Sequence, residues 1–390
     1  MYKKAFLLFL ITLVVYHLSS RGEGAHWNYF VLLADAFLHG RLDLLQNPLW
    51  LNELVNWQGR YYVVFPPMPA VLLVPFVYIF GTSFSQPFAS VFFGSISAAI
   101  SYLVFLNIFR DKKIAIWSSL LFAFGTIFWF HAEVGSAWYF AQIVANLFLW
   151  IMLLEVTTKK RLFLVGLFIG AAYLSRIPTI LAAIFPVIYL HDKFFLFQNN
   201  KIRNINWQNI SLYAFGLIAA LFLNALYNYF RFGVVYDIAY QLLPVFNEPW
   251  YKYGLVSFYY IPVHLIEMFT ALPRIVNYPP FMIPSMFAMA VWFTTPAFLL
   301  IAFARYKTKI IFASAVTAIA IAIPSLMHGG NGFTQFGYRH TLDYLPFLLI
   351  LVISGMRENL KWWIKALIIL SIVVNLWGVI MISFLSIWTM

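Results

Sequence analysis

The sequence predicts an all-α integral membrane protein with about eleven transmembrane helices and amphipathic surface helices in its external loops. Hydrophobic residues make up 63% of the chain, charged residues only 10%, and the mean hydropathy is +0.84. A soluble fold of this composition would have too few polar residues to cover its surface. Apolar runs long enough to cross a bilayer also follow one another along most of the chain.

Eleven apolar runs are the predicted spans, and two of them are short. The short runs meet at Arg176-Ile177-Pro178, where proline interrupts helical hydrogen bonding, so we expect tilted or broken helices there. The first run follows two lysines but no small-x-small cleavage site comes after it, which predicts an uncleaved helix. The predicted spans are residues 4–20, 88–109, 114–131, 136–156, 162–175, 177–191, 208–228, 285–304, 309–327, 343–356 and 363–386.

Charge distribution predicts which side each loop faces. The run "PPMPAVLLVPFVYIFG" at 66–81 is assigned to the membrane interface, because the basic clusters then agree with the positive-inside rule. The N-terminus is then cytoplasmic, and 9 of the 13 acids are external. The cytoplasmic side would hold 17 of the 25 basic residues: Lys3, Lys4, Arg110, Lys112, Lys113, Lys159, Lys160, Arg161, Lys193, Lys201, Arg203, Arg305, Lys307, Lys309, Arg357, Lys361 and Lys365.

This topology places two long external segments, 21–87 and 229–284, within a single membrane domain of residues 1–390. In 26–45, apolar residues from Tyr29 to Phe37 recur at helical spacing, which predicts a helix lying on the membrane surface. Residues 256–273 show a similar pattern. Such loops can roof a cavity at the outer membrane boundary.

Several functional classes are excluded by missing residues. The chain has no cysteine, so disulfides, thiolate metal sites and cysteine nucleophiles are ruled out. It contains no P-loop, GxGxxG or HExxH motif and no clustered metal-ligand spacing, so we expect neither a cofactor nor a metal. The net charge of +12 resides in short clusters between apolar runs, as topology signals do, so no nucleic-acid partner is expected.

Two carboxylates are candidate catalytic groups. Glu23, in "RGEGAH", follows the first span, where it can act as a general base; the alternative is a solvated loop acid beside Arg21. Glu133, in "WFHAEVGSAWYFAQ", lies in a short external turn among aromatic residues, where partial burial would raise its pKa. Its alternative is a capping acid at the start of the fourth span.

Three arginines, Arg176, Arg231 and Arg339, fall at predicted external helix ends. Arginine suits bidentate recognition of phosphate, and a lipid-linked phosphate would lie at this depth. The alternative is snorkelling to the headgroups, which competes most strongly for Arg231 in "YNYFRFG". For Arg339 in "QFGYRHTLD" we favour a ligand or an ion pair, with Asp343 four residues later as the expected partner.

Six of the eight histidines and most acids gather on the predicted external side. Ordinary solvation of exposed loops is the alternative, but the cytoplasmic loops are solvated by Lys, Asn and Arg without this mixture. Groups that exchange protons, gathered at a lipid–water boundary, indicate a site. The further site candidates are His26, Asp35, His131, Tyr338, His340 and Asp343.

Several segments resemble the GT-C superfamily of membrane glycosyltransferases, which includes protein O-mannosyltransferases and the lipid A aminoarabinose transferase. "EGAHWNYFVLLADAFLHGRLDL" followed by "NWQGRYYVVFPPMPAVLLVPFVYIFG" is similar to that group's first external loop, and "AAYLSRIPTILAAIFP" to its Arg-Pro break. "YNYFRFG" and "GYRHTLDYLPFLLIL" resemble later segments. By position, Glu23 and Glu133 match the group's two acidic positions, although the group often has a pair of acids where this chain has Gly22-Glu23.

The resemblance implies an inverting transfer of a sugar from a polyprenyl-phosphate donor to an acceptor at the external face of a cell membrane. Glu23 with Glu133 would deprotonate or orient the acceptor, and Arg339, aided by Arg176 and Arg231, would stabilise the leaving phosphate. The alternatives are a non-catalytic polyprenyl-lipid carrier or flippase, and a scaffold subunit. A transporter should carry polar residues along a path through the bilayer. The predicted spans are nearly free of charge at their centres, which favours the enzyme.

Overall fold

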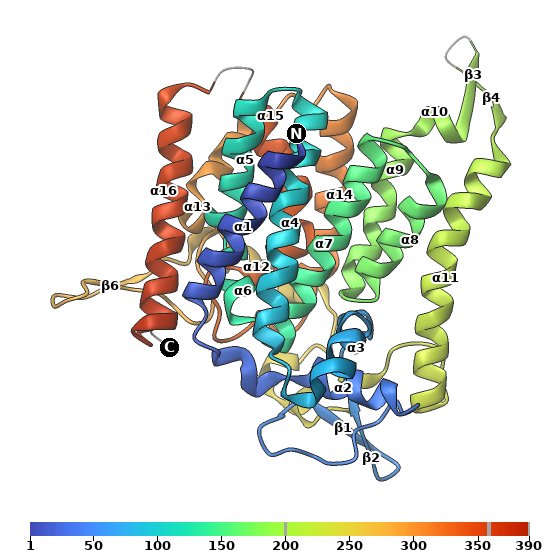
Figure 1. Cartoon of the computed structure of the whole chain (residues 1–390), viewed down its shortest axis with the longest axis vertical. Coiled ribbons are helices and arrows are strands. Elements are labelled where there is room, and N and C mark those ends of the chain that lie inside the picture. Colours follow the sequence, from blue (N-terminus) through green and yellow to red (C-terminus); the bar gives the residue numbers. More distant parts are fainter. Residues whose placement is uncertain (199–200, 357–359, 389–390) are drawn as a thin grey trace.

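Most of the helices run side by side in one bundle (Figure 1). The computed structural model describes residues 1–198, 201–356 and 360–388. Six helices are long and apolar enough to cross a membrane, and there are seven spans if a pair bent by 52° counts as one, so the all-α membrane class is confirmed. The six are α1 (Tyr2–Ser19), α4 (Gln86–Phe109), α7 (Ala137–Thr157), α11 (Trp207–Phe232), α14 (Lys309–Leu326) and α16 (Trp362–Val379), which a π-helical turn, Ile380–Phe384, continues.

The other predicted spans fall on shorter or broken helices, and the count of eleven remains a prediction. The bent pair is α5 (Lys112–Phe124) with α6 (Phe128–Val134). The remaining pieces are α8 (Leu162–Tyr173), the 3₁₀ helix η3 (Ile177–Ala183) with α9 (Ile184–Tyr189), α13 (Val291–Thr294) with the 3₁₀ helix η8 (Pro296–Phe303), and the 3₁₀ helix η9 (Arg339–Tyr344) with α15 (Leu345–Gly355).

Prolines stand at the starts of these pieces. The break expected at 176–178 is confirmed, because α8 ends at Tyr173 and Pro178 lies in the first turn of η3. Proline at the first turn has its φ already set for a helix and leaves no amide donor unpaired. Pro296 and Pro346 occupy the same position in η8 and α15.

Helices α8 and α11 approach each other through glycines. A Cβ atom on Gly216 would lie 2.3 Å from the carbonyl oxygen of Phe163, and one on Gly166 would lie 2.3 Å from that of Tyr213. Small residues at such a crossing let the backbones meet, which compensates for the lack of a hydrophobic driving force between helices in lipid. This contact fixes the position of α11 against the bundle.

The two long segments between α1 and α4, and between α11 and α13, cover the end of the bundle opposite the N-terminus, which we call the loop end (Figure 1). Both predicted surface helices are shorter than expected: α2 spans Tyr29–Leu38 and α12 spans Ile261–Thr270. The run at 66–81 contains α3 (Met68–Phe80), which packs against α2. The other elements of these segments are β1 (Leu54–Trp57), β2 (Arg60–Val63), β5 (Arg274–Ile275), β6 (Met282–Ile283) and the 3₁₀ helices η1 (Glu23–Trp27), η2 (Gly81–Ser83), η4 (Ala239–Leu242), η5 (Pro244–Asn247), η6 (Pro249–Tyr251) and η7 (Phe258–Tyr260).

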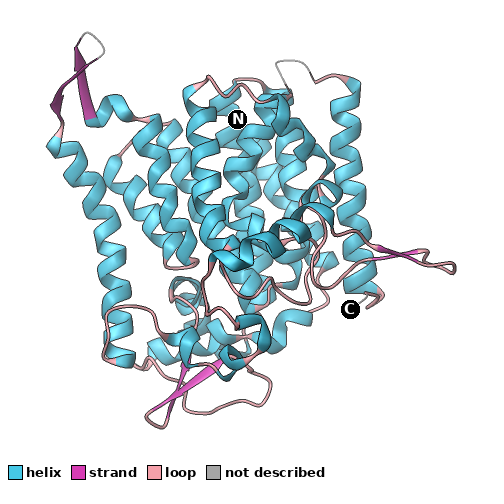
Figure 2. Cartoon of the chain, turned by 180° about the vertical axis from the view of Figure 1, so that it is seen from behind, coloured by secondary structure: helices cyan, strands magenta, loops and turns pink. Residues whose placement is uncertain are grey.

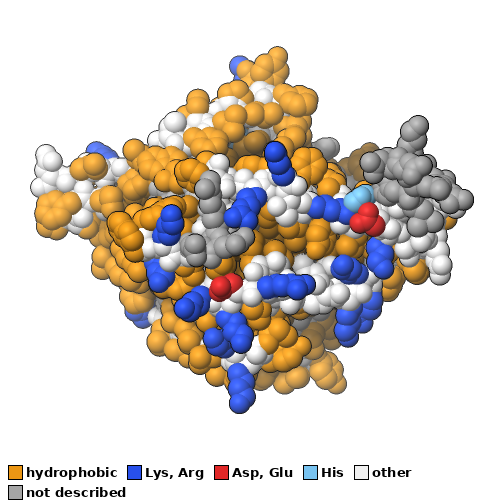
Figure 3. Space-filling view, turned by 90° about the horizontal axis from the view of Figure 1, so that it is seen from above, with side chains coloured by type: hydrophobic (Ala, Val, Ile, Leu, Met, Phe, Trp, Pro, Cys, Tyr) orange, Lys and Arg blue, Asp and Glu red, His pale blue; other side chains and the backbone are white. Residues whose placement is uncertain are grey.

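The opposite end, which we call the basic end, carries the N-terminus, α10 (His191–Phe194) and the hairpin of β3 (Phe195–Gln198) and β4 (Lys201–Ile205). Viewed from this end, Lys and Arg side chains are spread across the face with few acids among them (Figure 3). Seen from behind, β3–β4 projects from the basic end, β5–β6 projects sideways and β1–β2 lies at the loop end (Figure 2). Arg357, which is expected on this side, lies outside the described residues.

We expect Gly216→Val to destabilise the protein by about 3 kcal/mol, the upper range for overpacking, because the Cβ would meet the backbone of α8 rather than a movable side chain. Thermal unfolding of detergent-purified protein measures the effect. Ile218→Val, on the exposed face of the same helix, is the control and should change the unfolding temperature little. Equal unfolding temperatures for the two variants would contradict the close approach of α8 and α11.

Candidate active site

The segment Gly337–Tyr344 enters the bundle at the loop end and carries the candidate Arg339. Gly337 has φ +74, and a Cβ there would lie 2.6 Å from Ile127, so the chain turns tightly before η9. Two amides of α7 hold η9: Gln142 donates to the carbonyl of Arg339 at 3.0 Å, and Asn146 to that of Leu342 at 2.8 Å. The Arg339 side chain is half-buried, and its guanidinium has no hydrogen bond or ion pair with any residue that the structure describes.

The expected pairing of Asp343 with Arg339 is wrong, since Asp343 pairs with Arg176. The Arg176 guanidinium donates from Nε to Oδ1 at 3.0 Å and from Nη2 to Oδ2 at 2.9 Å. The Asp343 side chain is fully buried, and that of Arg176 is 24% exposed. The expectation assumed an α-helix, whereas a 3₁₀ helix brings residues three apart onto one side. Asp343 therefore points away from Arg339 and joins η9 to the start of η3.

Around Arg339 lies a group of aromatic and charged residues from three loops. Tyr240 is within electrostatic range of Arg339, Arg176, Tyr251 and Glu53. Burial raises the pKa of Tyr240, so its hydroxyl stays protonated at neutral pH and can donate. Burial lowers the pKa of nearby His328 to about 4, so the positive charge here comes from the arginines at neutral pH.

Glu53 belongs to this group, and sequence reasoning missed it. Its carboxylate accepts a hydrogen bond from the indole of Trp138 at 3.0 Å, and its amide donates to the Tyr29 hydroxyl at 2.8 Å. Burial raises the pKa of Glu53, while the Trp138 bond and the Arg339 charge oppose the rise. The only available signal was an acid inside the otherwise apolar, aromatic stretch "PLWLNELVNW".

The two predicted catalytic acids come together beside this group. η1 packs directly on the α6–α7 turn, because a Cβ on Gly24 would lie 2.0 Å from the carbonyl oxygen of Val134. Glu133 is buried, accepts a hydrogen bond from Ser383 and lies within electrostatic range of Glu23. The Glu23 carboxylate accepts no hydrogen bond from the residues described, and burial raises its pKa.

Tyr139 links the acids and the arginine electrostatically. This buried residue of α7 is within electrostatic range of Arg339 and also of Glu23 and Glu133. Its hydroxyl donates to the carbonyl of Thr334, which holds the loop before η9. A carboxylate and a guanidinium that lack partners among the described residues are therefore both within electrostatic range of one tyrosine.

Hydrogen bonds through His264 join α12 to the loop that contains His328 and to Tyr338, which precedes η9. The ring of His264 bonds the carbonyl oxygen of His328 at 2.8 Å and the Tyr338 hydroxyl at 2.7 Å. Since a carbonyl only accepts, the Nε2 of His264 carries a proton and the Tyr338 hydroxyl donates to Nδ1 in the neutral ring. Tyr338 is thus a supporting residue, and His264, which the helical pattern did not single out, anchors both segments.

The remaining candidates lie apart or are bonded within the protein. His26 is exposed, and Asp35 lies 3.7 Å from His39 on α2. His131 bonds the carbonyl of Ile127. Arg231 is buried with its guanidinium donating to the Val63 carbonyl and the Asn228 side chain, which ties α11 to β2.

His340 is different, because both of its buried ring nitrogens lack a partner in the described structure. It stands against the rings of Tyr338, His264 and His328, between the supporting chain and the arginines. No three His, Asp or Glu residues of the described chain are grouped to hold a metal ion.

Comparison with solved structures shows the fold. ArnT from Cupriavidus metallidurans, described as bound to undecaprenyl phosphate, superposes with a TM-score of 0.55 at 14% identity over 91% of this chain, and its apo form with 0.54 at 16% identity. This chain spans 60% of the length of ArnT. The archaeal oligosaccharyltransferase AglB from Archaeoglobus fulgidus superposes with a TM-score of 0.48 at 14% identity, over 98% of this chain and 56% of AglB. No protein-family model and no curated protein matches the sequence. The chain thus shares the fold of ArnT over most of its length, in agreement with the fold-level resemblance noted in the sequence.

We expect Asp343→Asn to lower the free energy of unfolding by about 3 kcal/mol, the lower end of the cost of breaking a buried ion pair, because Arg176 keeps some solvent exposure. Asp35→Asn, at an exposed pair, is the control and should cost at most about 1 kcal/mol. Thermal unfolding of the purified variants compares them. Recovery of stability in Arg176→Met/Asp343→Leu would show that the loss comes from the unpaired charge, and an Asp343→Asn variant as stable as the control would refute the pairing.

Proposed function

We propose that this protein is a membrane glycosyltransferase that moves a sugar from a polyprenyl-phosphate donor to an acceptor at the loop end. One observation carries the proposal: Glu23 and Arg339, an acid and a cation that both lie within electrostatic range of Tyr139, have charged groups without a hydrogen-bond or ion-pair partner among the described residues. The other strong ionic groups nearby, Asp343, Arg176 and Glu133, are held by protein partners. The fold shared with ArnT, which binds undecaprenyl phosphate, supports a lipid phosphate as the ligand.

Arg339 is the proposed phosphate ligand. A guanidinium presents paired donors that match phosphate oxygens, and its charge does not depend on pH in the working range. The charge of Arg176 is compensated by its ion pair with Asp343, which leaves the guanidinium of Arg339 for the phosphate. The protonated hydroxyl of Tyr240 lies within range of both arginines and supplies a further donor. Charge that develops on the leaving phosphate would therefore meet fixed donors.

Glu23 is the proposed general base, since its carboxylate oxygens are open to an acceptor hydroxyl. The acceptor oxygen forms a bond to the anomeric carbon, and the bond from that carbon to the phosphate oxygen breaks with its electron pair leaving on phosphate. The hydroxyl proton passes to Glu23. Because the leaving phosphate needs no acid, one base suffices, and attack opposite to phosphate inverts the anomeric centre.

Glu133 and Glu53 are proposed to position substrate rather than to take the proton. Each carboxylate already accepts a hydrogen bond, from Ser383 and from Trp138 respectively. Glu53 is within electrostatic range of Arg339 without bonding it, and the proposed position of the sugar is between these two side chains. The negative charge of Glu53 would also stabilise the positive charge that develops on the anomeric carbon in the transition state.

The loop end is proposed to face the cell exterior and the basic end the cytoplasm, as the positive-inside rule requires. The structure gives little support to the alternative function, a non-catalytic lipid carrier. In the six long helices, the charged residues stand in the first or last two turns, such as Lys365 in α16 and Arg231 in α11. No charged path crosses these helices, whereas a flippase for a phosphate headgroup would need one.

Arg339→Ala is expected to lose the donor lipid. Mass spectrometry of lipids that co-purify with the wild-type protein should show a polyprenyl phosphate or its sugar adduct, reduced about tenfold or more in the variant because a charge-assisted bidentate contact is lost. Arg274→Ala, on the exposed β5–β6 hairpin, is the matched control. Bulk phospholipids alone in all three samples would remove the donor site from the proposal.

Glu23→Gln is expected to reduce turnover by about 10²- to 10⁴-fold while the co-purified lipid stays unchanged, as loss of a general base predicts. Glu53→Gln should act mainly on KM, and Glu248→Gln, exposed in the same end of the molecule, should behave as wild type. Since burial raises the pKa of Glu23, wild-type kcat/KM should fall as the pH drops through a midpoint above 4.5. Bound lipid without turnover in the wild type would instead favour the carrier.

A further inference from the structure

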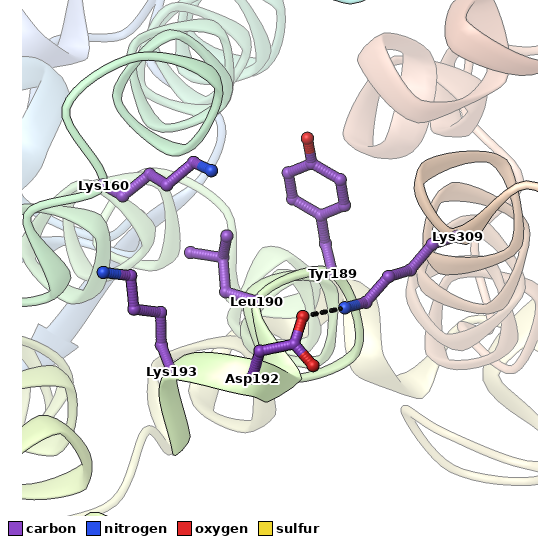
Figure 4. Close-up of a pocket in the computed structure, with 6 residues that line it drawn as sticks. All are labelled: Lys160, Tyr189, Leu190, Asp192, Lys193 and Lys309. Carbon is purple, nitrogen blue, oxygen red and sulfur yellow. Dashed lines mark hydrogen bonds and ion pairs between the residues drawn. The ribbon is translucent and has the colours of Figure 1, made fainter. Parts of the chain in front are cut away.

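A second set of cations lines two adjoining cavities at the basic end, far from the candidate active site in the fold. The first, of about 390 Å³, is lined by Lys160, Tyr189, Leu190, Asp192, Lys193 and Lys309 (Figure 4). The second, of about 280 Å³, is lined by Lys160, Arg161, Leu162, Phe163, Lys193, Asn209 and Leu212. Lys160 and Lys193 belong to both, so they stand where the cavities meet.

The other charges of these cavities neutralise one another. Lys309 contacts Asp192 at 2.9 Å, and Arg161 forms a two-pronged pair with Glu155 at 2.7 and 3.0 Å. The amino groups of Lys160 and Lys193 make no ion pair or hydrogen bond with the described part of the chain. Figure 4 shows them on one side of Leu190, with the Lys309–Asp192 pair on the other. Two uncompensated positive charges therefore remain.

The backbone holds both lysines in place. Lys160 has φ +57, a left-handed conformation that glycine adopts at lower cost, and its amide donates to the Glu155 carbonyl at 2.8 Å. The amide of Lys193 donates to the Leu190 carbonyl at 2.7 Å, and its own carbonyl accepts from Asn209 at 2.7 Å. The lysines thus project from fixed backbone points, one in the turn before α8 and the other in α10, which is bonded to the first turn of α11.

The second cavity adds an apolar wall next to these two lysines. Leu162 and Phe163 begin α8, and Leu212, 45% exposed, lies in the second turn of α11. A pair of cations in a cavity that also contains exposed Leu212 and partly buried Phe163, at the end of a transmembrane bundle, matches the chemistry of a lipid with an anionic phosphate head. A free phosphate would use the cations but not the apolar wall.

We propose that Lys160 and Lys193 bind the phosphate of an anionic phospholipid whose acyl chains lie along Phe163 and Leu212. The first cavity holds the remainder of the headgroup, where the Tyr189 hydroxyl lies beside it. This site stands independently of the proposed glycosyltransferase function, because it shares no residue with the loop end. Its occupant adds a headgroup contact that ties the α7–α8 turn to α10.

Native mass spectrometry of the full chain tests the site, with the protein released from micelles containing phosphatidylglycerol and phosphatidylcholine. Wild type should retain phosphatidylglycerol selectively, and Lys160→Gln/Lys193→Gln should lose that binding by about tenfold or more. Lys112→Gln/Lys113→Gln removes the same charge from exposed positions on the same face and should retain it. Millimolar inorganic phosphate should not displace the lipid.

Three results would overturn the proposal. Equal loss in both double variants would mean that the basic end attracts anionic lipid only through its overall charge. Displacement by inorganic phosphate would mean a simple anion site without a role for the apolar wall. Absence of selectivity in wild type would mean no site at all. Circular dichroism spectra matching wild type would show that the variants are folded, and Phe163→Ala, which leaves the charge unchanged, should weaken phosphatidylglycerol binding without affecting phosphate.

Discussion

The ion pair between Arg176 and Asp343 is the constraint on which the loop end depends. It joins two interruptions of helical structure, the break after α8 and the 3₁₀ turn that precedes α15, at a depth where an unpaired charge would be costly. Because Asp343 is occupied in this way, Arg339 on the same turn keeps an unpaired guanidinium. Once Gln142 and Asn146 also hold η9 to α7, that guanidinium has a defined place.

The charged side chains of the candidate site fall into two groups, those with protein partners and those without. Glu133, Glu53 and Arg231 each have partners that fix their orientation, and they shape the surroundings. Among the described residues, Glu23 and Arg339 lack such partners, and both lie within electrostatic range of Tyr139. The proposed transfer from a phosphate leaving group requires a base and a cation, and these two residues are the proposed pair. The single glutamate after Gly22 is consistent with a reaction that needs one base.

The two proposed phosphate sites, one at each end of the bundle, differ in kind. At the loop end, Arg339 lies near a protonated tyrosine and a neutral histidine, so the positive charge resides on arginine side chains. At the basic end, lysines stand over apolar side chains in open cavities, where a mobile lipid headgroup is the natural counter-charge. Helix α8 connects the two sites, because it lies between Lys160 at the basic end and Arg176 at the loop end. Its glycine contact with α11 fixes its position.

The sequence by itself determined the membrane class, the position of the long spans, the proline break near Arg176 and the separation of basic from acidic loops. Those properties depend on local composition and on the length of apolar runs, which can be read along the chain. The tertiary structure alone decided which charges meet. Asp343 turned away from Arg339 because η9 is a 3₁₀ helix, Glu53 entered the site through a loop with no regular pattern, and His264 was recruited from an apolar helix. Pairing between residues separated by up to 250 positions depends on how distant segments pack, and no local pattern encodes it.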